Sequence, residues 1–144
     1  MGATEKFARF IVETTFDKVP PKVVSYSKEL MLDAVGCALA GSVTPTGKII
    51  IDFTKELGGA KESGVIAGGF RTSAPNAAFA NGTLCHSMDY DDLGYHGHPS
   101  GTMVPVLLAL GEKLKRSGRE IMEAHAVGFE VYGNQGTIIL DARV

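Results

Sequence analysis

Helix-starting and helix-ending residues recur along the whole chain and divide it into segments of helical length. Pro20-Pro21 and Thr44-Pro45 each place a proline where the first turn of a helix accepts it, because that turn does not need the missing N–H. Glycines then end both segments, near Gly41 and at Gly58-Gly59. These signals predict one helix from Pro21 to about Gly41 and a second from Pro45 to about residue 57.

Further helices follow from the same kind of signal. We expect a first helix capped by Thr4, an alanine-rich helix over 74–85, a helix capped by Thr102 with Pro105 in its first turn, and a last helix over 120–140 behind the capping box Ser117-Gly118-Arg119-Glu120. The stretch 63–69 is short, rich in β-forming residues and bounded by glycine, so we expect it to be extended. The sequence therefore predicts a mainly α, bundle-like fold over residues 1–144 as a single domain, with at most one short extended segment.

Composition narrows the class of protein further. Hydrophobic residues make up 44% of the chain and charged residues 21%, which is a globular composition, and 144 residues suffice for a core. The net charge of -2 provides no basic field for nucleic acid. No run of about 18 apolar residues occurs, and the first residues are not those of a signal peptide, so we expect no membrane span. Cys37 and Cys85 are then expected to be reduced core thiols in a cytoplasmic protein.

One segment between two apolar helices differs sharply from the rest, because it concentrates histidine and aspartate. Within thirteen residues it contains His86, Asp89, Asp91, Asp92, His96 and His98. His86 and Asp89 are three residues apart, so they share a face on a helical turn. Glycines and a proline follow Asp92, so the last two histidines lie on a loop, and loops held by rigid helices often carry function.

Three interpretations of this cluster remain open on the residues alone. The side chains could be purely structural, capping helix ends and fixing the loop. They could bind a metal, since His and Asp are suitable ligands, although the spacing matches no strong metal motif. They could also perform general acid/base chemistry, because histidine titrates near neutrality and a nearby carboxylate raises its basicity.

The cluster and its flanks resemble the N-terminal signature of the MmgE/PrpD family. The residues that carry the resemblance are Asn81-Gly82, His86-Ser87-Met88-Asp89-Tyr90-Asp91-Asp92, His98-Pro99-Ser100-Gly101 and Val104-Pro105. The stretches 32–41 and 117–131 are similar to two long helices of the family, and the likeness covers about residues 5–135. The family includes 2-methylcitrate dehydratase, cis-aconitate decarboxylase and iminodisuccinate epimerase.

This resemblance implies a helical domain whose polar loop forms part of a pocket for a small di- or tricarboxylate, in a lyase that needs no metal or organic cofactor and forms a homodimer. Asp89 and His98 match the family's active-site aspartate and histidine, so both are predicted to be catalytic. His86, Asp92 and Ser100 are predicted to contact substrate, although a helix-end hydrogen bond is an equal alternative for His86. No residue is predicted to be a metal ligand.

Two departures from the family pattern affect what is expected. Many members have threonine where this chain has Leu93, which removes a substrate-contacting hydroxyl and disfavours cis-aconitate decarboxylation. Family members are also considerably longer, with a lid domain and a further lysine and histidine downstream. We therefore expect the N-terminal portion of a larger enzyme domain, similar to 2-methylcitrate dehydratase, with a decarboxylase or epimerase as alternative subtypes. The alternative from another class is a non-catalytic helical remnant or interaction module.

Overall fold

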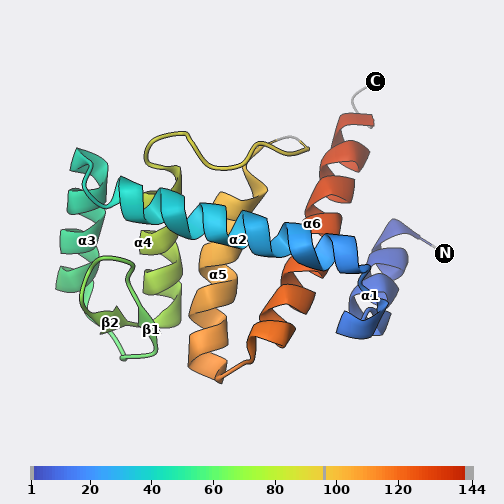
Figure 1. Cartoon of the computed structure of the whole chain (residues 1–144), viewed down its shortest axis with the longest axis horizontal. Coiled ribbons are helices and arrows are strands. Elements are labelled where there is room, and N and C mark those ends of the chain that lie inside the picture. Colours follow the sequence, from blue (N-terminus) through green and yellow to red (C-terminus); the bar gives the residue numbers. More distant parts are fainter. Residues whose placement is uncertain (1, 96, 142–144) are drawn as a thin grey trace.

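The structure of the chain, a computed structural model, describes residues 2–95 and 97–141, and within them it is mainly α-helical (Figure 1). In chain order the elements are α1 (Ala3–Glu13), the 3-10 turn η1 (Phe16–Lys18), α2 (Pro21–Gly41), α3 (Pro45–Leu57), β1 (Ser63–Gly64), β2 (Arg71–Thr72), α4 (Ala74–His86), α5 (Pro99–Leu114) and α6 (Gly118–Asp141). The predicted fold class is confirmed.

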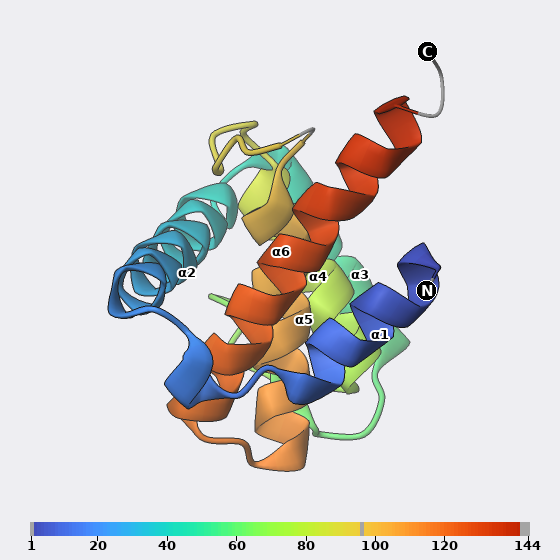
Figure 2. The same ribbon diagram turned by 90° about the vertical axis from the view of Figure 1, so that its right-hand side faces the viewer.

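The helices stand side by side in the order α3, α4, α5 and α6, and α2 runs across them (Figure 1). Turned by 90°, the same ribbon shows α1 and α2 on opposite sides of α6 (Figure 2). The core is centred on α4, whose Ala77, Ala80 and Leu84 are fully buried. α2 approaches α4 closely because a glycine lies at the contact: a Cβ atom at Gly41 of α2 would overlap the Leu84 backbone oxygen.

Most of the predicted helix boundaries are confirmed because they are set by local chemistry. Pro21 is the first residue of α2 and Gly41 its last. At α3 the Thr44 side chain accepts a hydrogen bond from the Gly47 N–H at 3.0 Å. The capping box at α6 is formed reciprocally, with Glu120 N donating to Ser117 Oγ and Ser117 N donating to the Glu120 carboxylate. Thr4, however, is not the cap of α1, which begins at Ala3, two residues earlier than expected, with Gly2 at the N-cap position.

The start of α5 differs from the prediction. The helix begins at Pro99, so Thr102 is its fourth residue and donates its hydroxyl hydrogen to the Pro99 backbone oxygen at 3.0 Å. Pro105 consequently lies inside the helix and not in its first turn. The capping group comes from the preceding loop, where Asp92 Oδ1 accepts from the Ser100 N–H at 3.1 Å. A carboxylate near a helix N-terminus is favoured by the helix dipole, which explains the earlier start.

The stretch that was predicted to be one extended segment is the first half of a short hairpin. Ser63–Gly64 pairs in antiparallel fashion with Arg71–Thr72, and the chain turns back over residues 66–69, where Ala67 and Gly69 have φ values of 57° and 72°. The buried side chain of Asn81 on α4 holds the hairpin, since its oxygen accepts from Ile66 N at 2.8 Å and its amide donates to Gly64 O at 3.0 Å. Asn81 therefore ties the hairpin to the central helix.

α3 presents apolar side chains on two faces. Gly47, Ile50 and Thr54 face the core and are buried. The line of apolar residues that the sequence shows at helical spacing, Ile49, Phe53 and Leu57, is exposed. Among the described residues, α2 and α3 reach the length and apolar character of a bilayer-crossing segment only when taken together, across a bend of 91°, and no single helix does so.

Candidate functional site

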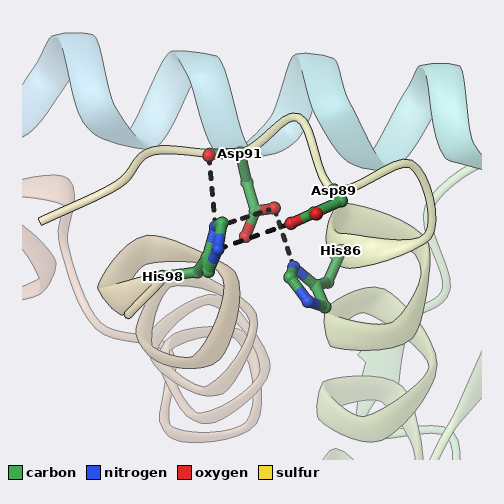
Figure 3. A group of neighbouring side chains, drawn as sticks. All are labelled: His86, Asp89, Asp91 and His98. Carbon is green, nitrogen blue, oxygen red and sulfur yellow. Dashed lines mark hydrogen bonds and ion pairs between the residues drawn. The ribbon is translucent and has the colours of Figure 1, made fainter. Parts of the chain in front are cut away.

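The histidine–aspartate cluster forms at the end of the bundle where α4 stops and α5 starts (Figure 3). His86 is the last residue of α4, and His98 directly precedes the first residue of α5. Because α4 and α5 pack against each other, the loop between them returns on itself and brings both histidines to one place. Asp89 and Asp91 lie on that loop, so four side chains from one short segment meet at one end of the fold. His96 lies outside the described residues.

Asp91 is the centre of the cluster. Its side chain is fully buried, and its Oδ1 lies 2.9 Å from Nδ1 of His86 and 3.4 Å from Nδ1 of His98. The same His98 nitrogen lies 3.3 Å from the backbone oxygen of Asp91. The two imidazole rings meet edge to face, with centroids 4.7 Å apart. Asp91 thus fixes both imidazole rings relative to each other.

The structure brings together the two residues that were predicted to be catalytic. Nε2 of His98 lies 3.4 Å from Oδ1 of Asp89. The Asp89 side chain is 78% exposed and that of His98 is 28% exposed, so the pair stands at the edge between solvent and protein. Asp89 has a φ of 51°, a left-handed conformation that aspartate tolerates better than most residues. Their convergence is as expected, and their catalytic role stays a prediction.

The predicted substrate-contacting residues Asp92 and Ser100 bind each other. Asp92 Oδ2 accepts a hydrogen bond from Ser100 Oγ at 2.9 Å, and Asp92 Oδ1 accepts one from Ser100 N. Ser100 is fully buried. These bonds close the first turn of α5 and hold the loop against it, which is a structural task. The third predicted contact, His86, is partly exposed beside Asp91.

A cavity of about 260 Å³ opens at the cluster. Its lining residues are His86, Asp91, His98, Gly101, Thr102 and Tyr132. The sequence predicted site roles for the two histidines but assigned none to the other four. Asp91 lies in the quoted motif, where nothing distinguishes it from its neighbouring aspartates. Tyr132 lies on α6, more than thirty residues downstream, and no local pattern links it to the loop.

α6 holds the loop in place through ring contacts. The Phe129 ring packs against that of Tyr95, with centroids 5.6 Å apart, and against that of His125 at 5.7 Å. Tyr95 lies directly on Gly133, where a Cβ atom would overlap its ring. His125 is 1% exposed, neither of its ring nitrogens has a hydrogen-bond partner in the described part of the chain, and burial lowers its pKa.

The electrostatics of the cluster keep His86 protonated over a wider pH range than a free histidine. The hydrogen bond to Asp91 raises the pKa of His86, and the charges of Asp91 and Asp89 add to that effect while desolvation opposes it. Beneath the cluster lies the thiol of Cys85, whose pKa burial raises to about 12. Cys85 is therefore protonated at neutral pH and is no nucleophile.

The site packs so closely that Gly101 has no room for a side chain. A Cβ atom there would overlap Oδ2 of Asp91 and would lie 3.8 Å from Sγ of Cys85. The carboxylate oxygen is itself buried and has no hydrogen-bond partner among the residues that the structure describes. Gly101 therefore permits the position of Asp91, on which the two histidines depend.

The same four side chains are also the ones that could hold a metal ion. His86, Asp89, Asp91 and His98 each offer one ligand atom, and these atoms lie within 4.8 Å of one another. Imidazole and carboxylate ligands together suit Zn²⁺ and related transition metals. The geometry is thus compatible with both chemical interpretations of the cluster, and the pairing of each imidazole with a carboxylate is also what acid/base chemistry requires.

Comparison with known proteins assigns the chain to a family. Residues 5–142 match the model of the MmgE/PrpD N-terminal domain. The chain is 36% identical to the cis-aconitate decarboxylase of Homo sapiens over 137 residues and 35% identical to that of Mus musculus over 139 residues. These alignments cover 90% and 92% of this chain and 28% of each relative. The cis-aconitate decarboxylase of Aspergillus terreus is 25% identical over 138 residues, 90% of this chain and 28% of that relative.

The named relatives indicate decarboxylases more specifically than dehydratases, which differs from the subtype that the sequence favoured. The chain spans about 28% of the length of these relatives. The match to the N-terminal domain model extends over the His–Asp loop and the helices on both sides of it. From this match we conclude that the chain belongs to the MmgE/PrpD family.

Proposed function

We propose that this chain supplies the acid/base part of the active site of a lyase that acts on a small polycarboxylate, with decarboxylation of cis-aconitate as the preferred reaction. The observation that carries the proposal is the placement of His98, whose imidazole lines the cavity between the carboxylates of Asp89 and Asp91. A histidine held in this way can exchange a proton with a bound substrate.

The two nitrogens of His98 have different neighbours, and this difference suits proton transfer. Nδ1 faces the backbone oxygen and carboxylate of Asp91, which favour a proton on that nitrogen. Nε2 is then the atom that takes up or releases the exchangeable proton. Oδ1 of Asp89 lies 3.4 Å from Nε2, so a carboxylate stands beside the nitrogen that exchanges the proton. His98 is thus held in one orientation, with Nε2 toward Asp89 and Nδ1 toward Asp91.

In a decarboxylation this arrangement provides the proton that the carbon needs. The bond between a carbon of the substrate and one carboxylate breaks, CO₂ leaves, and the electron pair stays on the carbon. The His98 imidazolium donates its Nε2 proton to that carbon and is later reprotonated by solvent. His86, whose pKa is raised by Asp91, adds positive charge beside a substrate that carries several negative charges.

Dehydration of 2-methylcitrate, the subtype that the sequence favoured, would use His98 in the opposite direction, as the base that removes a proton beside a carboxylate. The names of the relatives favour decarboxylation. Because the chain spans 28% of those relatives, we propose that it contributes one part of the active site. Binding of the substrate is therefore the property to test on this chain.

The test is a titration of the ¹⁵N-labelled chain with cis-aconitate, followed by NMR. We expect saturable shifts at the cavity residues, and we expect His98→Gln and Asp89→Asn to weaken binding at least tenfold. Asp52→Asn is the control, because Asp52 is an exposed carboxylate on α3, outside the cavity lining. Binding that is unchanged in His98→Gln would contradict the proposal.

A second candidate function, an interaction module without catalysis, is favoured by one observation. The side chains of Ile49, Phe53 and Leu57 on α3 are exposed although they are large and apolar. Size-exclusion chromatography combined with thermal melts separates the two functions. A defined species, monomer or the predicted homodimer, whose melting temperature rises with cis-aconitate supports the lyase, whereas a melting temperature that ignores the ligand supports the module.

A further inference from the structure

We propose that Tyr132 is a substrate-binding residue that donates its hydroxyl hydrogen to one carboxylate of the substrate and so selects for polycarboxylates. The inference rests on the proposed function of the His–Asp site. It concerns a residue of α6, outside the segment in which the sequence concentrates its polar side chains.

The hydroxyl of Tyr132 lies at the end of the cavity that His98 lines. Its side chain lines the cavity together with His86 and His98. The hydroxyl oxygen reaches the loop immediately before His98, since a Cβ atom at Gly97 would lie 2.8 Å from it. Gly97 thus leaves the space into which the hydroxyl projects. A ligand in contact with His98 is therefore within reach of this phenol.

The hydroxyl of Tyr132 is available for such a bond. The structure gives it no hydrogen-bond partner within residues 2–95 and 97–134, whose side chains it describes, and the residue is partly buried. The other hydroxyl of the lining, that of Thr102, already donates to the Pro99 backbone oxygen. Of the described lining side chains that carry a hydroxyl, Tyr132 is the one whose hydrogen is free for a ligand. A partly buried donor without a partner gains more from a ligand than one that is already bonded.

Charge in the cavity determines which ligand group fits this donor. The buried carboxylate of Asp91 repels a negatively charged ligand, while the two imidazoles beside it offer ring N–H groups to one carboxylate of the substrate. A second carboxylate has to bind elsewhere on the lining, and a neutral phenolic donor satisfies it without adding charge. Tyr132 then distinguishes a ligand that has this second carboxylate from one that lacks it.

The experiment measures the affinity of the 144-residue chain and of Tyr132→Phe for three probes by calorimetry. The probes are tricarballylate and the two dicarboxylates that lack one of its carboxylates, glutarate and methylsuccinate. Loss of a hydrogen bond to a charged group predicts that Tyr132→Phe binds tricarballylate about 10- to 100-fold more weakly. The dicarboxylate that lacks the contacted group should bind both proteins alike. Tyr26→Phe, an exposed tyrosine of α2, is the matched control and should change nothing.

The outcomes separate this inference from the proposed function. If Tyr132→Phe weakens all three probes equally, the hydroxyl only supports the loop, and the inference is wrong. If tricarballylate binding depends on His98 but not on Tyr132, the proposed function stands and the inference fails. If the unaltered chain binds none of the probes, the proposed function fails first and the inference with it.

Discussion

Replacing Gly101 by alanine should destabilise the protein, although the same change in a helix usually stabilises it. Alanine is favoured over glycine inside a helix by about 1 kcal/mol. Gly36 of α2 shows the ordinary case, because a Cβ atom there would meet no atom within 4 Å. At Gly101 the added carbon would instead overlap Oδ2 of Asp91 and force the carboxylate to move. The two substitutions are therefore expected to have opposite signs.

The expected change in the free energy of unfolding follows from the contacts that Asp91 makes with the two histidines. Its hydrogen bond to His86 involves charge on both partners and would contribute about 1.5–3 kcal/mol if fully buried. The His86 side chain is 53% exposed, so solvent screening reduces that figure. The weaker contacts with His98 are lost as well. Against a helix gain of about 0.5–1 kcal/mol, we expect Gly101→Ala to lose a net of about 1 kcal/mol and Gly36→Ala to gain up to about 1 kcal/mol.

Urea denaturation of the two variants measures these free energies of unfolding, and NMR titration of the histidine side chains measures the local cause. The pKa of His86 should fall in Gly101→Ala, because its hydrogen bond to Asp91 is the largest cause of its elevation. It should stay unchanged in Gly36→Ala. The reasoning is refuted if Gly101→Ala is as stable as Gly36→Ala and keeps the raised pKa of His86.

Two further predictions concern pH and metal. Burial lowers the pKa of His125, so the unfolded chain binds a proton at higher pH than the folded chain, and the free energy of unfolding falls as the pH drops through the ordinary histidine range near 6.5. His125→Leu should flatten this pH dependence in urea denaturation at pH 5–7. An unchanged pH dependence would assign it to other groups. If the histidine–aspartate cluster works by acid/base chemistry, treatment with EDTA leaves the affinity for cis-aconitate unchanged and added Zn²⁺ lowers it; loss of binding in EDTA would favour a metal site.

The sequence predicted those parts of the fold whose causes lie within a few residues. Pro21 fixes the start of α2 by its restricted φ and missing N–H, and the Ser117–Glu120 box fixes that of α6 by reciprocal hydrogen bonds. The start of α5 was wrong because its capping carboxylate, Asp92, reaches it from a loop seven residues before Pro99. The face that α3 buries was also not readable from its apolar line, because Gly47, Ile50 and Thr54 are buried while that line is exposed.

The candidate site was predictable only in part for the same reason. Asp89 and His98 were named from the family resemblance, and the structure places them in contact. Asp91, which organises both histidines, has the same residue type as its neighbours, and its burial depends on α5 packing over it through Gly101. Tyr132 comes from α6, so its place in the cavity depends on the tertiary fold.

The buried thiol of Cys85, which lies beneath the histidine–aspartate cluster, is unreactive in the folded protein. Burial raises the pKa of this thiol to about 12, so it stays protonated at pH 7. Alkylating reagents should not modify the Cys85 thiol until α4 and α5 separate. The rate at which iodoacetamide labels Cys85 would then measure how often α4 and α5 separate beneath the site.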